Sequence, residues 1–127
     1  MSTPQNAINW FELPSADFQR AVSFYNAILA TSLKVEKFGP ESTDMAVFPA
    51  ADDGAAGCVI HDAKYRPHAD GAVVYLNCEP SIDQVLDRVA GAGGAVIQPK
   101  TALPPGMGFF AHIADTEGNR VGLHALG

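Results

Sequence analysis

Apolar residues in the first half of the chain change their spacing from two residues to three or four and back again. Residues 8–13 alternate, with Ile8, Trp10 and Glu12 on one side, which predicts a strand. From about residue 15 to residue 30, apolar side chains recur every three or four positions, which predicts an amphipathic helix. Three shorter strands are predicted after it, at residues 33–38, 44–49 and 57–61. The pattern therefore predicts a β-α-β-β-β unit.

The second half repeats this plan. It predicts a strand at 72–77, a helix from 82 to about 91, and strands at 95–99, 108–114 and 120–124. Ser81 and Gln84 form a capping box at the start of the helix. We expect one α+β domain over residues 1–127, with module one at about 6–63, a linker at 64–70 and module two at about 71–127. Only residues 1–5 look disordered.

The repeat can be aligned within the sequence. A shift of 65 positions places Trp10 on Tyr75 and Glu12 on Asn77, and a shift of 63 places His61 on His124. A unit of this length cannot bury its sheet alone. The two units must therefore pack together or exchange across a dimer.

Composition and charge exclude several classes of function. The net charge is −6, and the eight Lys and Arg residues are scattered, so no basic surface for nucleic acid or anionic membranes is expected. No apolar run approaches the roughly 20 residues of a membrane helix, and the N-terminus lacks signal-peptide features. Cys58 and Cys78 lie in apolar runs and are predicted to be buried thiols. We expect a cytoplasmic protein.

Two segments carry a family resemblance. Residues 10–17, followed by Arg20-Ala21 and Phe24-Tyr25, form a strand and a helix start, and residues 115–124 form a hairpin turn and a last strand. These resemble the opening and closing motifs of the vicinal oxygen chelate (glyoxalase/bleomycin resistance/dioxygenase) superfamily, in particular a subgroup described only as glyoxalase-related.

The resemblance covers essentially the whole chain. It implies two tandem βαβββ modules that form a curved, mixed-sheet cup around a small-molecule ligand. It also implies a homodimer, since the superfamily usually buries the edges of the cup by pairing. It does not imply one reaction, because members include enzymes and metal-free drug-sequestering proteins.

Metal-dependent members of the superfamily take their ligands from the first and last strand of each module. Carried over to this sequence, those positions fall on Ile8, Val59, Val73 and Gly122. None of these side chains offers the oxygen, imidazole or thiolate that a divalent ion needs. We therefore predict that the usual metal site is degraded and that the protein uses no cofactor.

Polar side chains on the same faces are candidate catalytic residues. Alternation places Glu12, His61 and His124 there. They could act as acid–base groups, or form a displaced site for a divalent metal with two His and one carboxylate. Because an isolated buried carboxylate is costly, we expect Glu12 to line the cup or to pair with Arg20 or Arg120. The two histidines could instead be ordinary residues at strand ends.

A second set of residues is predicted to contact a ligand: Trp10, Glu12, Tyr75, Asn77, Met107 and Phe110. Trp10 and Tyr75 are either core residues or stacking platforms. Residues 101–108 form an apolar loop that either closes over the ligand or only connects two strands. Other polar residues are expected to be ordinary: His68 and His112 at the surface or pocket rim, and Asp52, Asp53, Asp115 and Glu117 in solvated turns.

Three functions remain open at this point. The first is a non-catalytic binder of an aromatic or apolar small molecule. The second is a lyase- or isomerase-like enzyme that uses Glu12 with His61 or His124, and the third is a partner-regulated module without a ligand. The missing metal ligands favour the binder.

Overall fold

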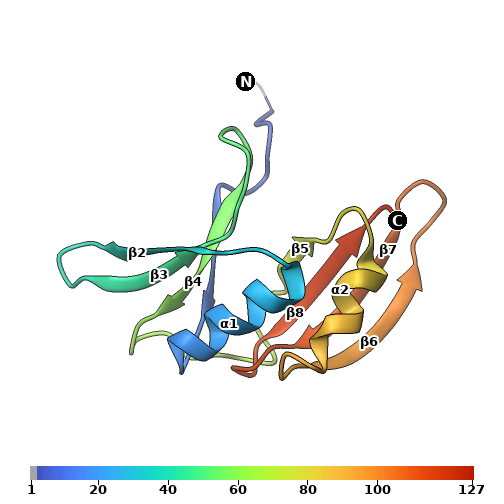
Figure 1. Cartoon of the computed structure of the whole chain (residues 1–127). Helices are drawn as coiled ribbons and strands as arrows, with labels where there is room; N and C mark the ends of the chain where they lie inside the picture. Colours follow the sequence, from blue (N-terminus) through green and yellow to red (C-terminus); the bar gives the residue numbers. More distant parts are fainter. Residues whose placement is uncertain (1–2) are drawn as a thin grey trace.

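The computed structural model describes residues 3–127, so residues 1 and 2 of the segment predicted to be disordered lie outside it. The first module contains β1 (Trp10–Pro14), α1 (Phe18–Leu29), β2 (Lys34–Phe38), β3 (Thr43–Val47) and β4 (Ala56–His61). The second contains β5 (Tyr75–Asn77), α2 (Ile82–Val89), β6 (Ala95–Ala102), β7 (Phe109–Ala114) and β8 (Arg120–Ala125) (Figure 1). The predicted β-α-β-β-β repeat is confirmed.

Each module forms its own four-stranded mixed sheet. The strand orders are β1-β4-β3-β2 and β5-β8-β7-β6, so the two modules share one topology. In both sheets the first and last strands of the module pair in parallel, and the other neighbours are antiparallel. Within residues 3–127, β1 and β5 are hydrogen-bonded along one side only, so each is an edge strand.

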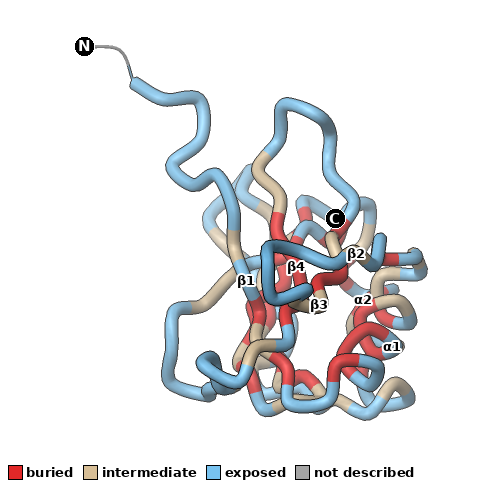
Figure 2. Tube along the Cα trace, turned by 90° about the vertical axis from the view of Figure 1, so that its left-hand side faces the viewer, coloured by how far each residue is buried: buried red, intermediate tan, exposed pale blue. Residues whose placement is uncertain are grey.

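One core lies between the two sheets. Phe24, Tyr25 and Ile28 of α1 and Ile82 and Val89 of α2 are fully buried in a cluster that also takes side chains from both sheets. The two helices contact each other and pack on one side of each sheet, where buried residues gather (Figures 1 and 2). Met45, Cys58 and Ile60 form a separate, smaller buried cluster on the first sheet. The other side of each sheet, here called its open face, therefore points away from this core. No helix within the described residues is long and apolar enough to cross a membrane.

The helix starts follow from local capping. The Asp17 carboxylate accepts a hydrogen bond from the Arg20 backbone N–H at 3.1 Å, so α1 begins at Phe18 and not at residue 15. The Ser81 hydroxyl accepts from the Gln84 N–H at 3.4 Å, which confirms the predicted cap of α2. The first strand was predicted at residues 8–13, but β1 begins at Trp10 and ends at Pro14, a residue that an edge strand tolerates.

Two strands differ in length from their prediction. β5 covers only residues 75–77 of the expected 72–77. β6 extends to Ala102 through two register shifts, so the predicted loop is shortened to residues 103–108. Bulges of this kind let a strand continue past Pro99, which the sequence pattern placed at its end.

The β7–β8 turn, residues 115–119, docks onto the start of α1. The Glu117 side chain is 0% exposed and accepts hydrogen bonds from the Asp17 N–H at 2.7 Å and the Ala16 N–H at 2.9 Å. Arg20 Nε donates to the same carboxylate at 2.7 Å. The expectation that Glu117 is solvated is therefore wrong, because a helix N-terminus provides N–H donors and a favourable dipole for a carboxylate.

Asp115 was also expected to be solvated and is buried. Its Oδ2 accepts a hydrogen bond from Tyr25 Oη at 2.6 Å, and its Oδ1 accepts from the Asn119 N–H at 2.9 Å. Burial raises the pKa of Tyr25 well above 10, and the negative charge of Asp115 adds to this. The Tyr25 hydroxyl therefore stays protonated and donates across the boundary between the modules.

Candidate functional site

A cavity of about 760 Å³ lies on the open face of the second sheet. We call it the second-module cup. Its polar side chains include Tyr75 and Asn77 of β5 and His124 of β8, and the strand register places Asn77 opposite His124 and His124 opposite Phe110. The remaining lining residues are Leu76, Glu79, Leu103, Met107 and Leu126.

The wall of the cup is formed by the loop of residues 103–108. His124 Nε2 lies 2.8 Å from the Met107 carbonyl oxygen. Because a carbonyl oxygen only accepts, Nε2 carries the hydrogen and donates it. This bond ties the loop to β8, so apolar side chains of the loop stand over polar groups of the sheet. Such a lining suits an apolar ligand with a few polar atoms.

Next to this cup, Tyr75, His112 and Arg120 form a hydrogen-bonded series across three strands. Tyr75 Oη lies 2.6 Å from His112 Nε2, and Arg120 Nε donates to His112 Nδ1 at 2.9 Å. Tyr75, Phe110 and His112 also contact one another as rings, with centroids 5.4–6.4 Å apart. Burial lowers the pKa of His112 below 6.5, and the positive charge of Arg120 lowers it further.

Gly122 makes the Tyr75–His112 contact possible. The register places Gly122 between Tyr75 of β5 and His112 of β7. A Cβ atom on Gly122 would lie 2.4 Å from the Tyr75 ring, which is closer than any real contact. The ring therefore crosses β8 only because residue 122 has no side chain.

The open face of the first sheet holds the matching residues of module one. Trp10 Nε1 donates to Glu12 Oε2 at 3.3 Å, and both residues are exposed. Neither residue is therefore in the core, and the burial penalty expected for Glu12 does not arise. Cys58 lies beside Glu12 in the register; burial raises the pKa of this thiol to about 12, and the negative charge of Glu12 adds to the effect.

The arginine partners expected for Glu12 are engaged elsewhere. Arg20 binds Glu117, and Arg120 binds His112. Glu12 lines neither the second-module cup nor the larger cavity described below. The cavities of a single chain therefore do not include Glu12, and its contact with a ligand stays a prediction.

The predicted equivalence of His61 and His124 is wrong. β1 pairs Glu12 with Cys58, whereas β5 pairs Asn77 with His124, so Cys58 holds the place of His124. The shift of 63 was anchored on the hairpin turns, but the β3–β4 connection at 48–55 is longer than the β7–β8 turn at 115–119. His61 lies beyond this position, where its Nδ1 donates to the Ser15 carbonyl oxygen at 2.9 Å.

The register also corrects the positions of the usual metal ligands. Gly122 pairs with Tyr75, and the equivalent pair in the first sheet is Ala56 with Trp10. Val59 belongs to the core and does not face the cup, so the set predicted as Ile8, Val59, Val73 and Gly122 becomes Trp10, Ala56, Tyr75 and Gly122. Of these only Tyr75 carries a donor atom that suits a metal, so the residues do not fit a divalent ion.

A displaced metal site is not assembled within one chain either. Among residues 3–127, no three His, Cys, Asp or Glu side chains lie close enough together to hold a metal ion. Of the predicted catalytic residues, only His124 reaches the second-module cup.

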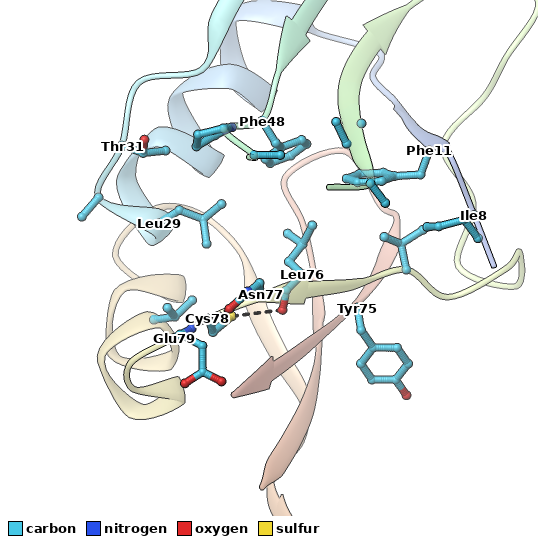
Figure 3. Close-up of a pocket in the computed structure, with 18 of the residues that line it drawn as sticks. Ile8, Phe11, Leu29, Thr31, Phe48, Tyr75, Leu76, Asn77, Cys78 and Glu79 are labelled. Carbon is cyan, nitrogen blue, oxygen red and sulfur yellow. Dashed lines mark hydrogen bonds between the residues drawn. The ribbon is translucent and has the colours of Figure 1, made fainter. Parts of the chain in front are cut away.

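A second cavity, of about 810 Å³, lies between the two modules (Figure 3). Ile8, Phe11, Leu29, Phe48 and Leu76 are among the apolar side chains that line it. Polar side chains, among them Gln84 and Arg88, line this cavity as well, and it shares Tyr75, Leu76, Asn77 and Glu79 with the second-module cup. Its walls include the exposed edge strands β1 and β5, and such edges are surfaces that commonly pair with another chain. We therefore place the candidate site in the second-module cup.

The structure brings together four of the predicted ligand residues in the cup, namely Tyr75, Asn77, Met107 and Phe110. Trp10, on the other sheet, lines the cavity between the modules with Tyr75 and Asn77, and Glu12 lines neither cavity. His112 and Arg120 were not predicted as site residues. The signal was present, because His112 alternates with Phe110 in β7 and Arg120 alternates with Gly122 in β8.

One family model matches most of the chain. The model for the Glyoxalase/Bleomycin resistance protein/Dioxygenase superfamily matches residues 7–123. No curated protein sequence is significantly similar to the chain.

Solved structures share the fold at low sequence identity. A glyoxalase I mutant from Zea mays superposes with a TM-score of 0.70 at 20% identity, covering 93% of this chain and 45% of that one. The hypothetical protein SA1046 from S. aureus gives 0.64 at 17% identity, covering 98% and 95%. TnmS3, an antibiotic-binding protein from Streptomyces sp. CB03234, gives 0.62 at 19% identity, covering 98% of both chains. These likenesses show the fold alone.

Proposed function

The chain belongs to the Glyoxalase/Bleomycin resistance protein/Dioxygenase superfamily, and on this premise we propose that it binds an apolar or aromatic small molecule without a metal ion. The observation that carries the proposal is the second-module cup, where apolar walls surround Tyr75, Asn77 and His124. Of the four side chains at the metal positions of the superfamily, only Tyr75 offers a donor atom, which favours binding over metal-assisted chemistry. An antibiotic-binding protein with the same fold supports this kind of function.

We propose in addition that the binding unit is a homodimer. The shared core lies between the two sheets, so the open face with Trp10 and Glu12 cannot meet the cup of its own chain. Large exposed side chains lie in the edge strands and just before β1, with Trp10 43%, Tyr75 49% and Ile8 54% exposed. Pairing of these edges between two chains would let the first sheet of one chain close the cup of the other.

A cytoplasmic location belongs to the same proposal. Cys58 and Cys78 are free and buried, and burial raises the pKa of Cys78 to about 11. Thiols of this kind suit a reducing compartment.

The ligand site is tested with the neutral ketone 2-acetylnaphthalene as a probe. We expect the probe to shift backbone amide NMR signals of residues 75–77, 103–110 and 124–126, with or without EDTA. Phe110→Ala should weaken binding about tenfold or more, roughly 1.4 kcal/mol, because an aromatic wall is lost.

The control is Phe38→Ala, which removes a phenyl ring that is 62% exposed on β2 and should leave the affinity unchanged. Shifts confined to residues around Ile8, Phe11 and Phe48 would place the ligand in the cavity between the modules instead. Absence of any shift up to the solubility limit of the probe would also contradict the proposal.

A further inference from the structure

The series Tyr75–His112–Arg120 determines which group donates each hydrogen. Arg120 Nε carries a hydrogen and no lone pair, so His112 Nδ1 must accept at 2.9 Å. A neutral imidazole has one N–H, which therefore lies on Nε2. Nε2 is 2.6 Å from Tyr75 Oη, so the tyrosine oxygen accepts this hydrogen. The hydroxyl hydrogen of Tyr75 is then directed away from His112.

The surroundings keep His112 neutral. Its ring contacts Phe110 and Tyr75, and the charged group that faces it is the Arg120 guanidinium. Burial and this positive charge lower the pKa of His112, so the ring is uncharged at neutral pH. Each hydrogen bond of the series therefore has a defined donor: Arg120 donates to His112, and His112 donates to Tyr75.

We propose that Tyr75 is a hydrogen-bond donor to the ligand and that the ligand carries a neutral carbonyl oxygen beside an apolar or aromatic body. This deepens the function proposed above and rests on it. Tyr75 lines the second-module cup and is 49% exposed, and its hydroxyl points away from the cavity between the modules (Figure 3).

The negative charge near the cup favours a neutral ligand oxygen over an anionic one. The Glu79 side chain lines the same cavity, and the chain carries a net charge of −6. A carboxylate or phosphate would be repelled there, whereas a ketone, aldehyde, amide or quinone oxygen only needs a donor. A hydroxyl that already accepts a hydrogen bond donates more strongly, because hydrogen bonds in a series polarise one another. His112 and Arg120 act through Tyr75 and are positioning residues.

The first test needs no ligand. Long-range ¹H–¹⁵N spectra distinguish the two neutral tautomers of histidine, and His112→Gln identifies the signals of His112 among the four histidines. At pH about 8 we expect the Nε2–H form of His112. The Nδ1–H form would overturn the proposal, because Tyr75 would then donate its hydrogen to His112.

The second test compares two probes of the same shape, 2-acetylnaphthalene and 2-isopropylnaphthalene. We expect the wild type to bind the ketone at least fivefold more tightly, and Tyr75→Phe to lose this preference while still binding the hydrocarbon. Tyr65→Phe, which changes an exposed tyrosine in the linker, is the control and should keep the preference.

The outcomes separate the two proposals. An unchanged ketone preference in Tyr75→Phe overturns the donor role while leaving the binding function intact. If the wild type binds neither naphthalene, the proposed function fails, and the His112 tautomer still decides whether the Tyr75 hydroxyl is directed outward.

Discussion

The Glu117 side chain is a fully buried carboxylate at the contact between the two modules. Burial by itself raises its pKa, but hydrogen bonds from Arg20, Asp17, Thr116 and Ala16 outweigh burial and lower the pKa from 4.5 to about 2. The folded state therefore favours the charged form. This stabilisation is complete above about pH 4.5 and is lost as the pH falls toward about 2.

Glu117→Gln should lower the free energy of unfolding by about 2 kcal/mol at pH 7, because in either amide orientation the NH₂ would face a donor, the backbone N–H groups of Ala16 and Asp17 or the Arg20 side chain. Urea unfolding measured from pH 7 to pH 3 checks this. We expect the difference in free energy of unfolding between the wild type and the variant to become smaller below about pH 4.5. Glu41→Gln, at an exposed position, is the control. A difference in unfolding free energy that stays constant over this pH range would contradict the link between the Glu117 charge and stability.

Among the elements, β5 is a short strand held by β8 and by one tyrosine ring. It has three residues, of which Tyr75 lies across Gly122 and Leu76 enters the core. The position of the cup residues therefore depends on how closely β5 and β8 approach at Gly122.

Gly122→Ala should cost about 1–3 kcal/mol of stability, because the new methyl group overlaps the Tyr75 ring in the wild-type geometry. It should also remove the His112 signal that reports the Tyr75 contact. Chemical denaturation and histidine NMR measure the two effects. Gly71→Ala is the control, since its nearest neighbour would be 3.7 Å away and it should change neither quantity. If Gly122→Ala kept the stability and the His112 signal of the wild type, Gly122 would not limit how closely β5 and β8 approach.

At the scale of the whole molecule, the two halves of the expected cup lie on opposite sides of one core. Trp10, Glu12 and Cys58 occupy one open face, and Tyr75, Asn77 and His124 occupy the other. Pairing of β1 with β5 of a second chain is the simplest way to bring such faces together.

The dimer is tested by light scattering at a protein concentration of roughly tens of micromolar. We expect twice the chain mass of 13.4 kDa for the wild type. Ile8→Lys, beside β1, should give monomers, because a charge in an apolar interface is costly to desolvate. Phe38→Lys places the same charge at another exposed apolar site and should remain dimeric. A monomeric wild type would refute the pairing.

The sequence by itself determined the elements and their order. Apolar spacing predicted both helices and the strands, and Ser81 was identified as an N-cap, because these features depend on neighbours a few residues apart. Alternation within β5 also placed Tyr75 and Asn77 on a ligand-facing side, and the structure gathers them with Met107, Phe110 and His124 in one cavity.

Only the tertiary structure decided which strands lie opposite each other and which groups meet. Pairing of β4 with β1 replaced His61 by Cys58 as the counterpart of His124. The sequence alignment missed this because the β3–β4 connection is longer than the β7–β8 turn, and only the pairing of the strands sets the register. Glu117 and Asp115 were predicted to be solvated turn residues, but the turn packs on α1 and both side chains accept hydrogen bonds there. Tyr75, His112 and Arg120 come from three strands. The hydrogen bond between Tyr75 and His112 depends on Gly122, which has no side chain to block the tyrosine ring. Contacts of this kind join residues that are distant along the chain, so local spacing carries no information about them.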